Sequence, residues 1–224
     1  MINLDKRLMS AYNLVRENTR AADIGTDHGY LICRLLTDKK ITHGYACDIN
    51  KSPLDNAKKT AQENGVENIS FILCDGLVGV PQTEVDDIII AGMGGELIAK
   101  ILSNAPWSRE KHLILQPMTK ADTLRRYLYN NGFFIESEIA VKDQKHHYSV
   151  MSVYYNGEYR DIDEIFAQIG KLTPDTDDAK AYILNRAEVF KKRADGLSKT
   201  NAQDSKQAYE IYTKLKEYAE NESK

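Results

Sequence analysis

Chemistry is most concentrated in residues 23–30, where the chain runs Asp-Ile-Gly-Thr-Asp-His-Gly-Tyr. The apolar residues before Gly25 predict a strand, and those after Tyr30 predict a helix. Glycines at positions 25 and 29 allow a sharp turn and a close approach of the backbone to a ligand. The first amides of the following helix lack intrahelical partners and can donate to that ligand. The segment predicts a ligand-binding turn at the carboxyl end of a strand, with a simple turn that binds nothing as the alternative.

The residue types inside this turn favour a cationic ligand. A dinucleotide fingerprint needs further glycines where this chain has Asp27 and Tyr30. A carboxylate at Asp27 would repel the pyrophosphate of a dinucleotide, whereas a positive ligand creates no such conflict. The pattern Asp-x-Gly-x-x-x-Gly resembles motif I of the class I methyltransferases, whose cofactor S-adenosylmethionine carries a sulfonium and an ammonium group. The resemblance implies that the cofactor contacts Asp23, Gly25, Thr26, Asp27, Gly29 and Tyr30.

Two further acids follow predicted strands. Asp48 ends a strand at 43–48, at a place where an acid can accept both ribose hydroxyls of an adenosine ligand. Asp75 and Gly76 follow a strand at 69–73, where the acid can accept the exocyclic amine of adenine and the glycine leaves room for the ring. Asp-Gly is also a common turn pair, which is the alternative for Asp75. We expect the nucleoside part of the cofactor to contact Asp48, Ile49, Asp75 and Gly76.

A second glycine cluster ends the apolar run at 86–91, which has the character of a central parallel strand buried on both faces. Glycines at 92, 94 and 95 remove side chains where a substrate must come close to the backbone. We expect Ala91 and Gly92 to contact the cofactor, and Gly92, Met93 and Gly94 to form a floor on which an acceptor base stacks. Many amino-methyltransferases carry Asn/Asp-Pro-Pro-aromatic at this point, and its absence argues against exocyclic-amine chemistry.

The elements that must position these residues alternate between strand and helix. Apolar spacing predicts helices at 4–17, 30–37, 52–64 and 121–131, and further strands at 112–115, 133–141 and 148–155. Ser52 is the expected N-cap of its helix. Arg7 lies on the polar side of the first helix, where we expect it to be solvated. This series predicts an α/β, Rossmann-like class I methyltransferase with a seven-stranded, mostly parallel sheet over residues 1–156.

The tail, residues 157–224, has a different pattern. Apolar residues at 183, 187, 190, 194 and 197 repeat after a polar break at 198–201 as 208, 211, 215 and 218. Steps of four and three predict an antiparallel coiled-coil hairpin of two helices. Its basic side chains are either a solvated helix face or an arm that contacts phosphates; they are Arg186, Lys191, Lys192, Arg193 and Lys199.

Whole-chain composition limits the class of protein. The 224 residues carry a net charge of −3, so any nucleic-acid contact needs a local basic patch rather than a generally basic surface. The tail and the residues Lys142, Lys145, His146 and His147 near the last hairpin are the candidates. The three cysteines lack metal-ligand spacing, no apolar run is long enough to span a bilayer, and no signal-peptide pattern opens the chain. These features predict a cytoplasmic protein without a structural metal.

The chain resembles a bacterial family, the tRNA (adenine-22)-N1-methyltransferases or TrmK family. The resemblance rests on residues 23–31 and on Ala-Gly-Met-Gly-Gly at 91–95, supported by Leu-Ile-Leu-Gln-Pro-Met at 113–118 and the helical tail. It implies transfer of a methyl group from S-adenosylmethionine to N1 of an adenine in the tRNA D arm. The implied partner is tRNA, with no membrane, no metal and no obligate protein partner. Ile32 stands where the family usually has proline, which should loosen the helix start without altering the chemistry.

N1 of neutral adenine already carries a lone pair, so alignment and charge stabilisation should dominate over base catalysis. Asp27 is the candidate for stabilising the cationic methylated base, or for holding the sulfonium or ammonium of the cofactor. His28 is a weaker candidate for positioning the base, with simple solvation as the alternative. Together with Gly92 and Met93 they form the expected catalytic set.

The sequence is also compatible with two other functions. The same fold could methylate ribosomal RNA, a protein or a small molecule, because motif I does not distinguish acceptors. A non-catalytic adenosine-binding module would bind the cofactor without turnover, with the tail holding a protein partner. A dehydrogenase is disfavoured by Asp27 and Tyr30.

Overall fold

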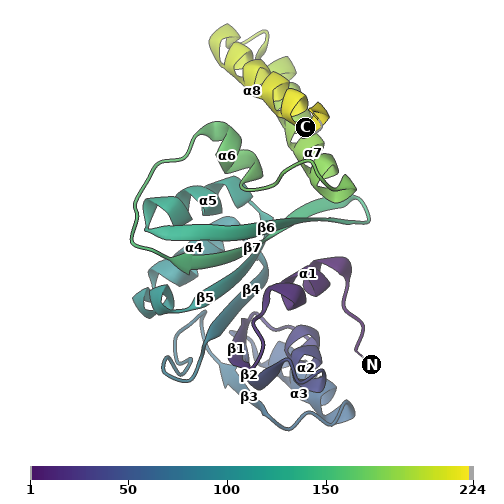
Figure 1. Cartoon of the computed structure of the whole chain (residues 1–224), viewed down its shortest axis with the longest axis vertical. Helices are drawn as coiled ribbons and strands as arrows, with labels where there is room; N and C mark the ends of the chain where they lie inside the picture. The colour runs from purple at the N-terminus through teal and green to yellow at the C-terminus, as the bar shows by residue number, and fades with distance from the viewer. Residues whose placement is uncertain (1, 222–224) are drawn as a thin grey trace.

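The computed structural model describes residues 2–221, and its centre is one seven-stranded sheet (Figure 1). The strands are β1 (Thr19–Ile24), β2 (Ile41–Asp48), β3 (Ile69–Leu73), β4 (Asp87–Gly94), β5 (His112–Thr119), β6 (Phe133–Asp143) and β7 (His146–Tyr155). Their order is β3-β2-β1-β4-β5-β7-β6, and only β7 runs antiparallel to its neighbours. Strands β2 and β3 are added on one side of β1, and β4 and the later strands on the other side, so the strand order reverses between β1 and β4. The sheet confirms the Rossmann-like fold expected from the sequence.

Helices cover both faces of this sheet. They are α1 (Lys6–Leu14), α2 (Tyr30–Thr37), α3 (Lys51–Glu63), α4 (Gly95–Ser103) and α5 (Ala121–Asn130), with a short 3-10 helix η1 (Pro106–Glu110). The central strand β4 is buried on both sides: Ile88 and Ile90 pack in the cluster that includes α4 and α5, and Ile89 packs in the one that includes α1 and α2. The continuous apolar run of β4 follows from this double burial.

Several element boundaries differ from the sequence-based expectation. Helix α1 begins later because Asp5 caps it by accepting from the amide of Leu8 at 2.6 Å. It ends early because Val15 is extended, and the amide and guanidinium of Arg16 then bind the buried Asp87. The last two strands are longer than expected, because the left-handed conformation of Gln144 closes them in a tight turn.

The start of α3 also differs. Asn50, not Ser52, is its N-cap, and the carboxylate of Asp48 accepts from the amide of Asn50 at 2.8 Å. This hydrogen bond tightens the connection after β2, so the helix begins earlier than the Ser-Pro signal indicates.

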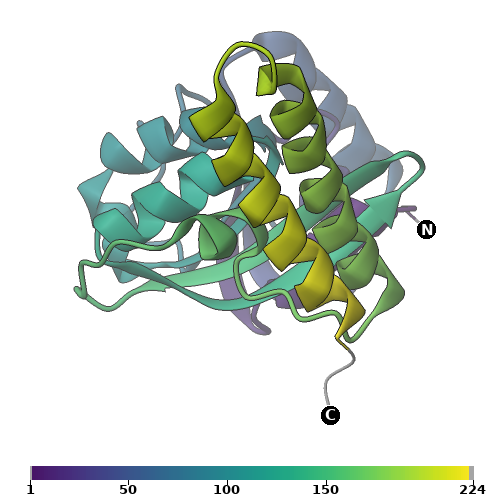
Figure 2. The same cartoon turned by 90° about the horizontal axis from the view of Figure 1, so that it is seen from above.

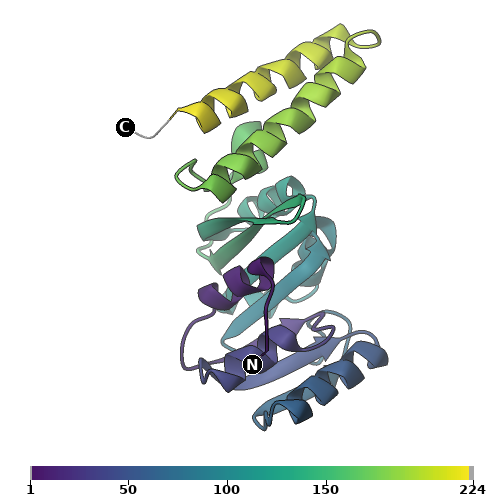
Figure 3. The same cartoon turned by 90° about the vertical axis from the view of Figure 1, so that its right-hand side faces the viewer.

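The tail contains α6 (Glu164–Ile169), α7 (Asp177–Leu197) and α8 (Ala202–Glu220). Helices α7 and α8 lie side by side in opposite directions and project from the end of the sheet that carries β6 and β7 (Figures 2 and 3). Their apolar stripe is buried between them, at Ile183, Ala187, Phe190, Ala194, Ala208 and Leu215. The predicted hairpin is therefore confirmed. Helix α6 was missed because six residues are too few to show a helical period.

A buried arginine joins the tail to the catalytic sheet. The side chain of Arg125 on α5 is fully buried and forms an ion pair with Glu138 on β6, also fully buried. It donates to the carbonyls of Ala167 at 2.7 Å and Gln168 at 3.0 Å, and to the hydroxyl of Tyr182 at 3.2 Å. One guanidinium therefore contacts α5, β6, α6 and α7 together, and we call this group the Arg125 junction.

Candidate cofactor and acceptor site

The predicted site residues come together at the carboxyl ends of β1, β2 and β4. Ile24 on β1 pairs with Cys47 on one side and Ile90 on the other. The residues that follow these three, namely Gly25, Asp48 and Ala91, therefore lie at the same level of the sheet. This is the point at which the strand order reverses, where open α/β sheets bind their ligands.

The loop between β1 and α2 has three residues in the left-handed region, Gly25 (φ 77°), Asp27 (φ 49°) and Gly29 (φ 68°). Asp27 is not a glycine, so its conformation costs energy and is typical of functional loops. Among residues 2–221, no group accepts a hydrogen bond from the amides of Asp27 or His28, so both are available to a ligand. The loop therefore presents backbone N–H donors to a ligand.

The two candidate catalytic side chains in this loop lie close together and are exposed. His28 Nε2 is 3.7 Å from Asp27 Oδ1. The His28 ring stacks on that of Tyr30, with centroids 5.2 Å apart. Asp27 is therefore accessible to an incoming acceptor rather than used in the fold.

The two glycine clusters touch one another. A Cβ atom at Gly25 would collide with the terminal methyl group of Met93, so any side chain at this position would displace the methionine. Gly92 is also left-handed, with φ 87°. The floor expected for the acceptor base therefore lies directly against the predicted cofactor loop.

Asp23 is a buried acid at the base of this loop, with 5% of its surface exposed. The hydroxyl of Thr26 donates to its carboxylate at 2.8 Å. Burial raises the pKa of Asp23 to about 6, with a further increase from Asp48, while Thr26 and Arg7 act to lower it. A buried acid with one hydrogen bond and a raised pKa is suited to a cationic partner.

Arg7 was expected in solvent, and this prediction was wrong. Its side chain is only 17% exposed, and Nη1 donates to the side-chain oxygen of Gln116 at 2.8 Å. The same oxygen accepts from the amide of Gly92 at 3.0 Å. Arg7 and the fully buried Gln116 thus position the second glycine cluster, and sequence periodicity cannot detect this contact because it joins residues 109 positions apart.

The remaining predicted cofactor residues lie at the ends of β2 and β3. Ile49 is exposed, as is Leu73, which pairs with Asp48, so apolar surface is available here for a flat ring. Asp75 is exposed, whereas a Cβ at Gly76 would lie 3.0 Å from Ile101. A Cβ at Gly29 would lie 2.8 Å from Ala57. The structure gives Gly29 and Gly76 packing roles, in addition to any contact with a ligand.

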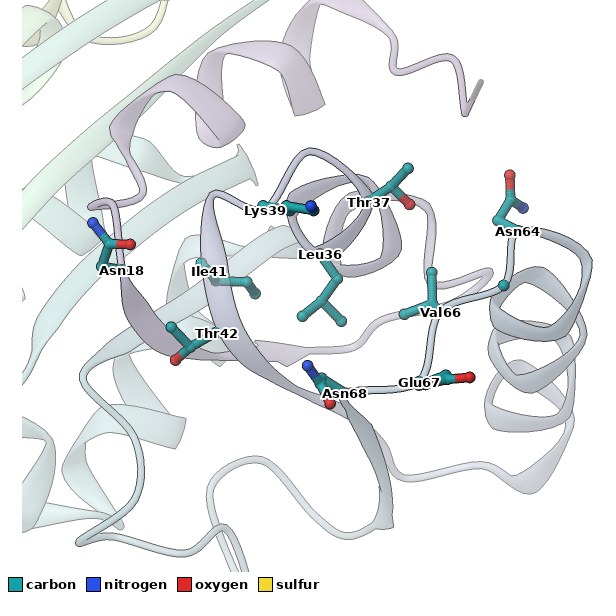
Figure 4. A pocket seen from close by; sticks show the side chains of 11 residues that line it. Asn18, Leu36, Thr37, Lys39, Ile41, Thr42, Asn64, Val66, Glu67 and Asn68 are labelled. Atoms are coloured by element: carbon teal, nitrogen blue, oxygen red, sulfur yellow. The ribbon is translucent and has the colours of Figure 1, made fainter.

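A cavity of about 610 Å³ lies away from this site (Figure 4). Asn18, Ile41 and Asn68, which line it, stand at the amino ends of β1, β2 and β3. The carboxyl ends of the same strands carry the glycine loop and the acids, so this cavity is not part of the row of site residues. Cys47, on β2 between the two ends, is fully buried and belongs to the core.

The reversal point between β1 and β4, the glycine loop and the acids at three strand ends together define a class I methyltransferase fold. A family model described as a methyltransferase domain matches residues 4–151. The chain belongs to that methyltransferase family and, within it, to the TrmK family of tRNA methyltransferases.

Individual relatives agree with this assignment. The tRNA (adenine(22)-N(1))-methyltransferase of Bacillus subtilis is 33% identical over 153 residues, which are 67% of this chain and 64% of that protein. The structure of Streptococcus pneumoniae Sp1610, a putative tRNA (m1A22) methyltransferase, is 25% identical with a TM-score of 0.86, covering 96% of this chain and 100% of that one. M. capricolum TrmK in complex with S-adenosyl-homocysteine is 26% identical with a TM-score of 0.80, covering 96% and 97%. The structural likeness thus includes the helical tail.

Among residues 2–221, no cluster of three or more histidine, cysteine or acidic side chains could hold a metal ion. Within the same range, the model contains no helix with the length and hydropathy of a membrane span.

Proposed function

We propose that this protein transfers a methyl group from S-adenosylmethionine to N1 of adenine 22 in the D arm of tRNA, giving 1-methyladenosine. The observation that carries the proposal is the contact between the two glycine clusters, Gly25 against Met93, beside the exposed carboxylate of Asp27. The name of the B. subtilis relative supports the same acceptor atom.

The residues fit an adenosine ligand with a positive charge. The amides of Asp27 and His28 are available donors, and the acids Asp23, Asp48 and Asp75 are grouped at adjacent strand ends. When bound, S-adenosylmethionine supplies an electrophilic methyl group on a sulfonium. Asp23 holds the ammonium, Asp48 the ribose hydroxyls, and Asp75 the adenine amine.

The chain's own residues then orient the acceptor. Gly92 and Met93 present a surface without a protruding polar side chain, on which the adenine ring stacks. Attack by N1 leaves a positive charge on the base, and Asp27 stabilises this charge more in the transition state than in the ground state. His28 positions the base beside it. Because N1 lies on the Watson–Crick edge, the adenine must be unpaired or flipped out to reach this floor.

The tail and the last hairpin supply the contacts to tRNA in this proposal. We assign residues 1–156 to the catalytic domain and 157–224 to the helical domain. We further propose that the protein works in the cytoplasm and without an obligate protein partner. The exposed Lys192, Arg193 and Lys199 on the hairpin are placed to contact phosphates.

Transfer of labelled methyl from S-adenosylmethionine to unmodified tRNA transcripts tests the function. We expect 1-methyladenosine from a transcript with adenine 22 and none from the same transcript with guanine at that position. Cofactor binding with no transfer to either transcript would reject tRNA adenine 22 as the acceptor.

Cofactor affinity should fall as the pH drops below about 6, the raised pKa of the buried Asp23. Protonation removes the charge that attracts the ammonium, so affinity should decrease by up to about tenfold per pH unit. Calorimetric titration with S-adenosylhomocysteine, which keeps the ammonium and lacks the sulfonium, measures this. In Asp23→Asn, affinity should be low and independent of pH over the same interval; an unchanged pH profile in that variant would assign the titration to another group.

The same pKa also affects the unliganded fold. The unfolded chain loses the Asp23 proton near the ordinary value of 3.8, and the folded chain near 6. Between these values the unfolded state binds fewer protons, so the contribution of Asp23 to stability falls as the pH rises.

A further inference from the structure

A small pocket lies where the tail meets the catalytic sheet. It is lined by residues from the end of β5, the start of α5, the start of β7, α6 and α7, and its volume is about 70 Å³. Its polar lining includes Lys120, Asp122, His147, Gln168 and Arg186. We call it the junction pocket, because it is also lined by Tyr182 of the Arg125 junction and by Ser149 on β7, whose hydroxyl accepts from Arg125 at 3.1 Å.

The junction pocket borders the acceptor floor. Thr119, in its wall, pairs with Gly94 at the end of β4. A Cβ at Gly95 would collide with the backbone carbonyl of Lys120, so Gly95 allows the turn that carries Lys120 to approach the second glycine cluster. Neighbouring strands are about 4.8 Å apart, so the pocket is only one strand away from the floor.

The turn that carries Lys120 is held in a costly conformation. Lys120 has φ 56° and ψ 40°, in the left-handed region, although it is not a glycine. Such residues persist only where the surroundings impose them, and they gather at functional sites. Its side chain is exposed, and among the described residues no carboxylate lies within 4 Å of its ammonium.

Arg186 reaches the pocket from α7. Its Nε donates to the side-chain oxygen of Gln168 at 2.9 Å, and Nη2 contacts the same oxygen. No acceptor in residues 2–221 pairs with its Nη1. Gln168 is itself buried and donates to Glu164 at 2.7 Å, so the guanidinium is fixed in place with donors to spare.

His147 supplies a buried polar atom without a partner. Its Nδ1 is inaccessible to solvent and forms no hydrogen bond with any group in residues 2–221. An unsatisfied buried polar atom destabilises the fold, and a hydrogen bond between this ring and a ligand would remove that penalty. Burial and Lys142 lower the pKa of His147, so the ring is neutral at pH 7 and keeps one N–H donor.

Size and charge identify the ligand class. A volume of about 70 Å³ corresponds to about two water molecules and is too small for a nucleobase. The pocket lining has two cationic side chains, Lys120 and Arg186, and one acidic side chain, Asp122, so its charge favours an anionic ligand. A guanidinium fork with spare donors suits phosphate oxygens.

We infer that the junction pocket binds one backbone phosphate of the RNA substrate, held by Lys120 and Arg186 with His147 behind them, next to the nucleotide that is methylated. This inference rests on the proposed function and adds a positioning contact to it. Phosphate contacts fix register without reading sequence. The pocket therefore sets which nucleotide can reach the floor.

Binding of an unmodified tRNA transcript, measured over a range of salt concentrations, tests the inference with Lys120→Gln and Arg186→Gln. We expect each variant to lose about tenfold in affinity, and the slope of log affinity against log salt to fall by about 0.7 to 0.9. The KM for tRNA should rise and the KM for S-adenosylmethionine should stay unchanged. The double variant should lose less than the sum of the two, because both residues hold one phosphate.

Lys39→Gln is the matched control, because Lys39 is also an exposed lysine in the left-handed region, with φ 57°. It lines the cavity of Figure 4 at the other edge of the sheet, so its loss should change neither affinity nor slope. If Arg186→Gln unfolds the tail through loss of the Arg186–Gln168 contact, Lys120→Gln still tests the inference, because the Lys120 side chain is exposed and its replacement should not affect folding. Wild-type affinity and slope in Lys120→Gln, or an equal loss in Lys39→Gln, would overturn the inference alone. Absence of tRNA binding by the wild-type protein would reject the proposed function as well.

Discussion

Asp27→Asn should slow methyl transfer by about 10²- to 10³-fold and change cofactor affinity by less than about threefold. The carboxylate is exposed in the loop beside the acceptor floor, and its one ionic partner within the described part of the chain is His28 at 3.7 Å. Its negative charge is therefore available to the cationic base formed during transfer. Asparagine keeps the size of the side chain and tolerates the left-handed φ of 49°, whereas alanine would add backbone strain to the effect.

Single-turnover transfer to tRNA, together with calorimetric titration of S-adenosylhomocysteine, separates the two quantities. Glu67→Gln, which removes an exposed negative charge at the edge of the cavity in Figure 4, is the control and should transfer at the wild-type rate. If Asp27→Asn loses cofactor affinity in proportion to rate, the carboxylate binds the cofactor rather than the base. A wild-type rate would remove Asp27 from the mechanism.

Arg125→Met should lower the free energy of unfolding by about 3–5 kcal/mol. The substitution leaves Glu138 buried without its cation and removes the donor from the carbonyls of Ala167 and Gln168. An uncompensated charge in the interior is more costly than the absence of the whole pair. Urea unfolding followed by circular dichroism measures the change.

The neighbouring residue offers a matched control. Arg126 on the same helix pairs with Glu164, but both side chains are about 40% exposed, so Arg126→Met should cost at most about 1 kcal/mol. The double variant Arg125→Met with Glu138→Leu should recover much of the lost stability, because no buried charge then remains unpaired. Equal losses in Arg125→Met and Arg126→Met would show that the Arg125 junction is not a buried electrostatic contact.

The Arg125 junction also decides how the tail can be tested. A chain that ends near residue 157 would lose Ala167, Gln168 and Tyr182, which accept from Arg125. Such a truncation would disturb the catalytic domain together with the tail. Substitution of exposed basic residues is the cleaner experiment.

The sheet and the loop residues were predictable because local patterns encode them. The apolar run of β4 identifies a strand covered on both faces, and the glycines at 25 and 29 stand at left-handed positions that few other residues adopt. The acids at 48 and 75 were found because Asp48 ends, and Asp75 follows, a strand that was recognisable by itself. A fixed chain topology then brings these strand ends together.

The missed residues depend on contacts between distant parts of the chain. The sequence around Arg7 places it on the polar side of α1, which indicates a solvated side chain. Only the fold shows that Arg7 donates to Gln116, whose side-chain oxygen also accepts from the amide of Gly92. Arg125 likewise has a polar helical context, although its side chain is fully buried. The left-handed Lys120 has no local turn signal, because the requirement comes from packing against Gly95. A buried glutamine before Pro117, at the end of an otherwise apolar strand, was the one usable clue.

The Arg125 junction has a mechanical consequence for the RNA. The Arg125–Glu138 ion pair is fully buried, and its guanidinium binds groups on β6, β7, α6 and α7, so the helical arm has little freedom to swing toward the catalytic floor. The distance between the helical arm and the catalytic floor is then fixed. The RNA, rather than the protein, must change its conformation to expose the target adenine. On the proposed function, discrimination among tRNAs would follow the ease with which each exposes the target adenine, rather than the sequence that it presents.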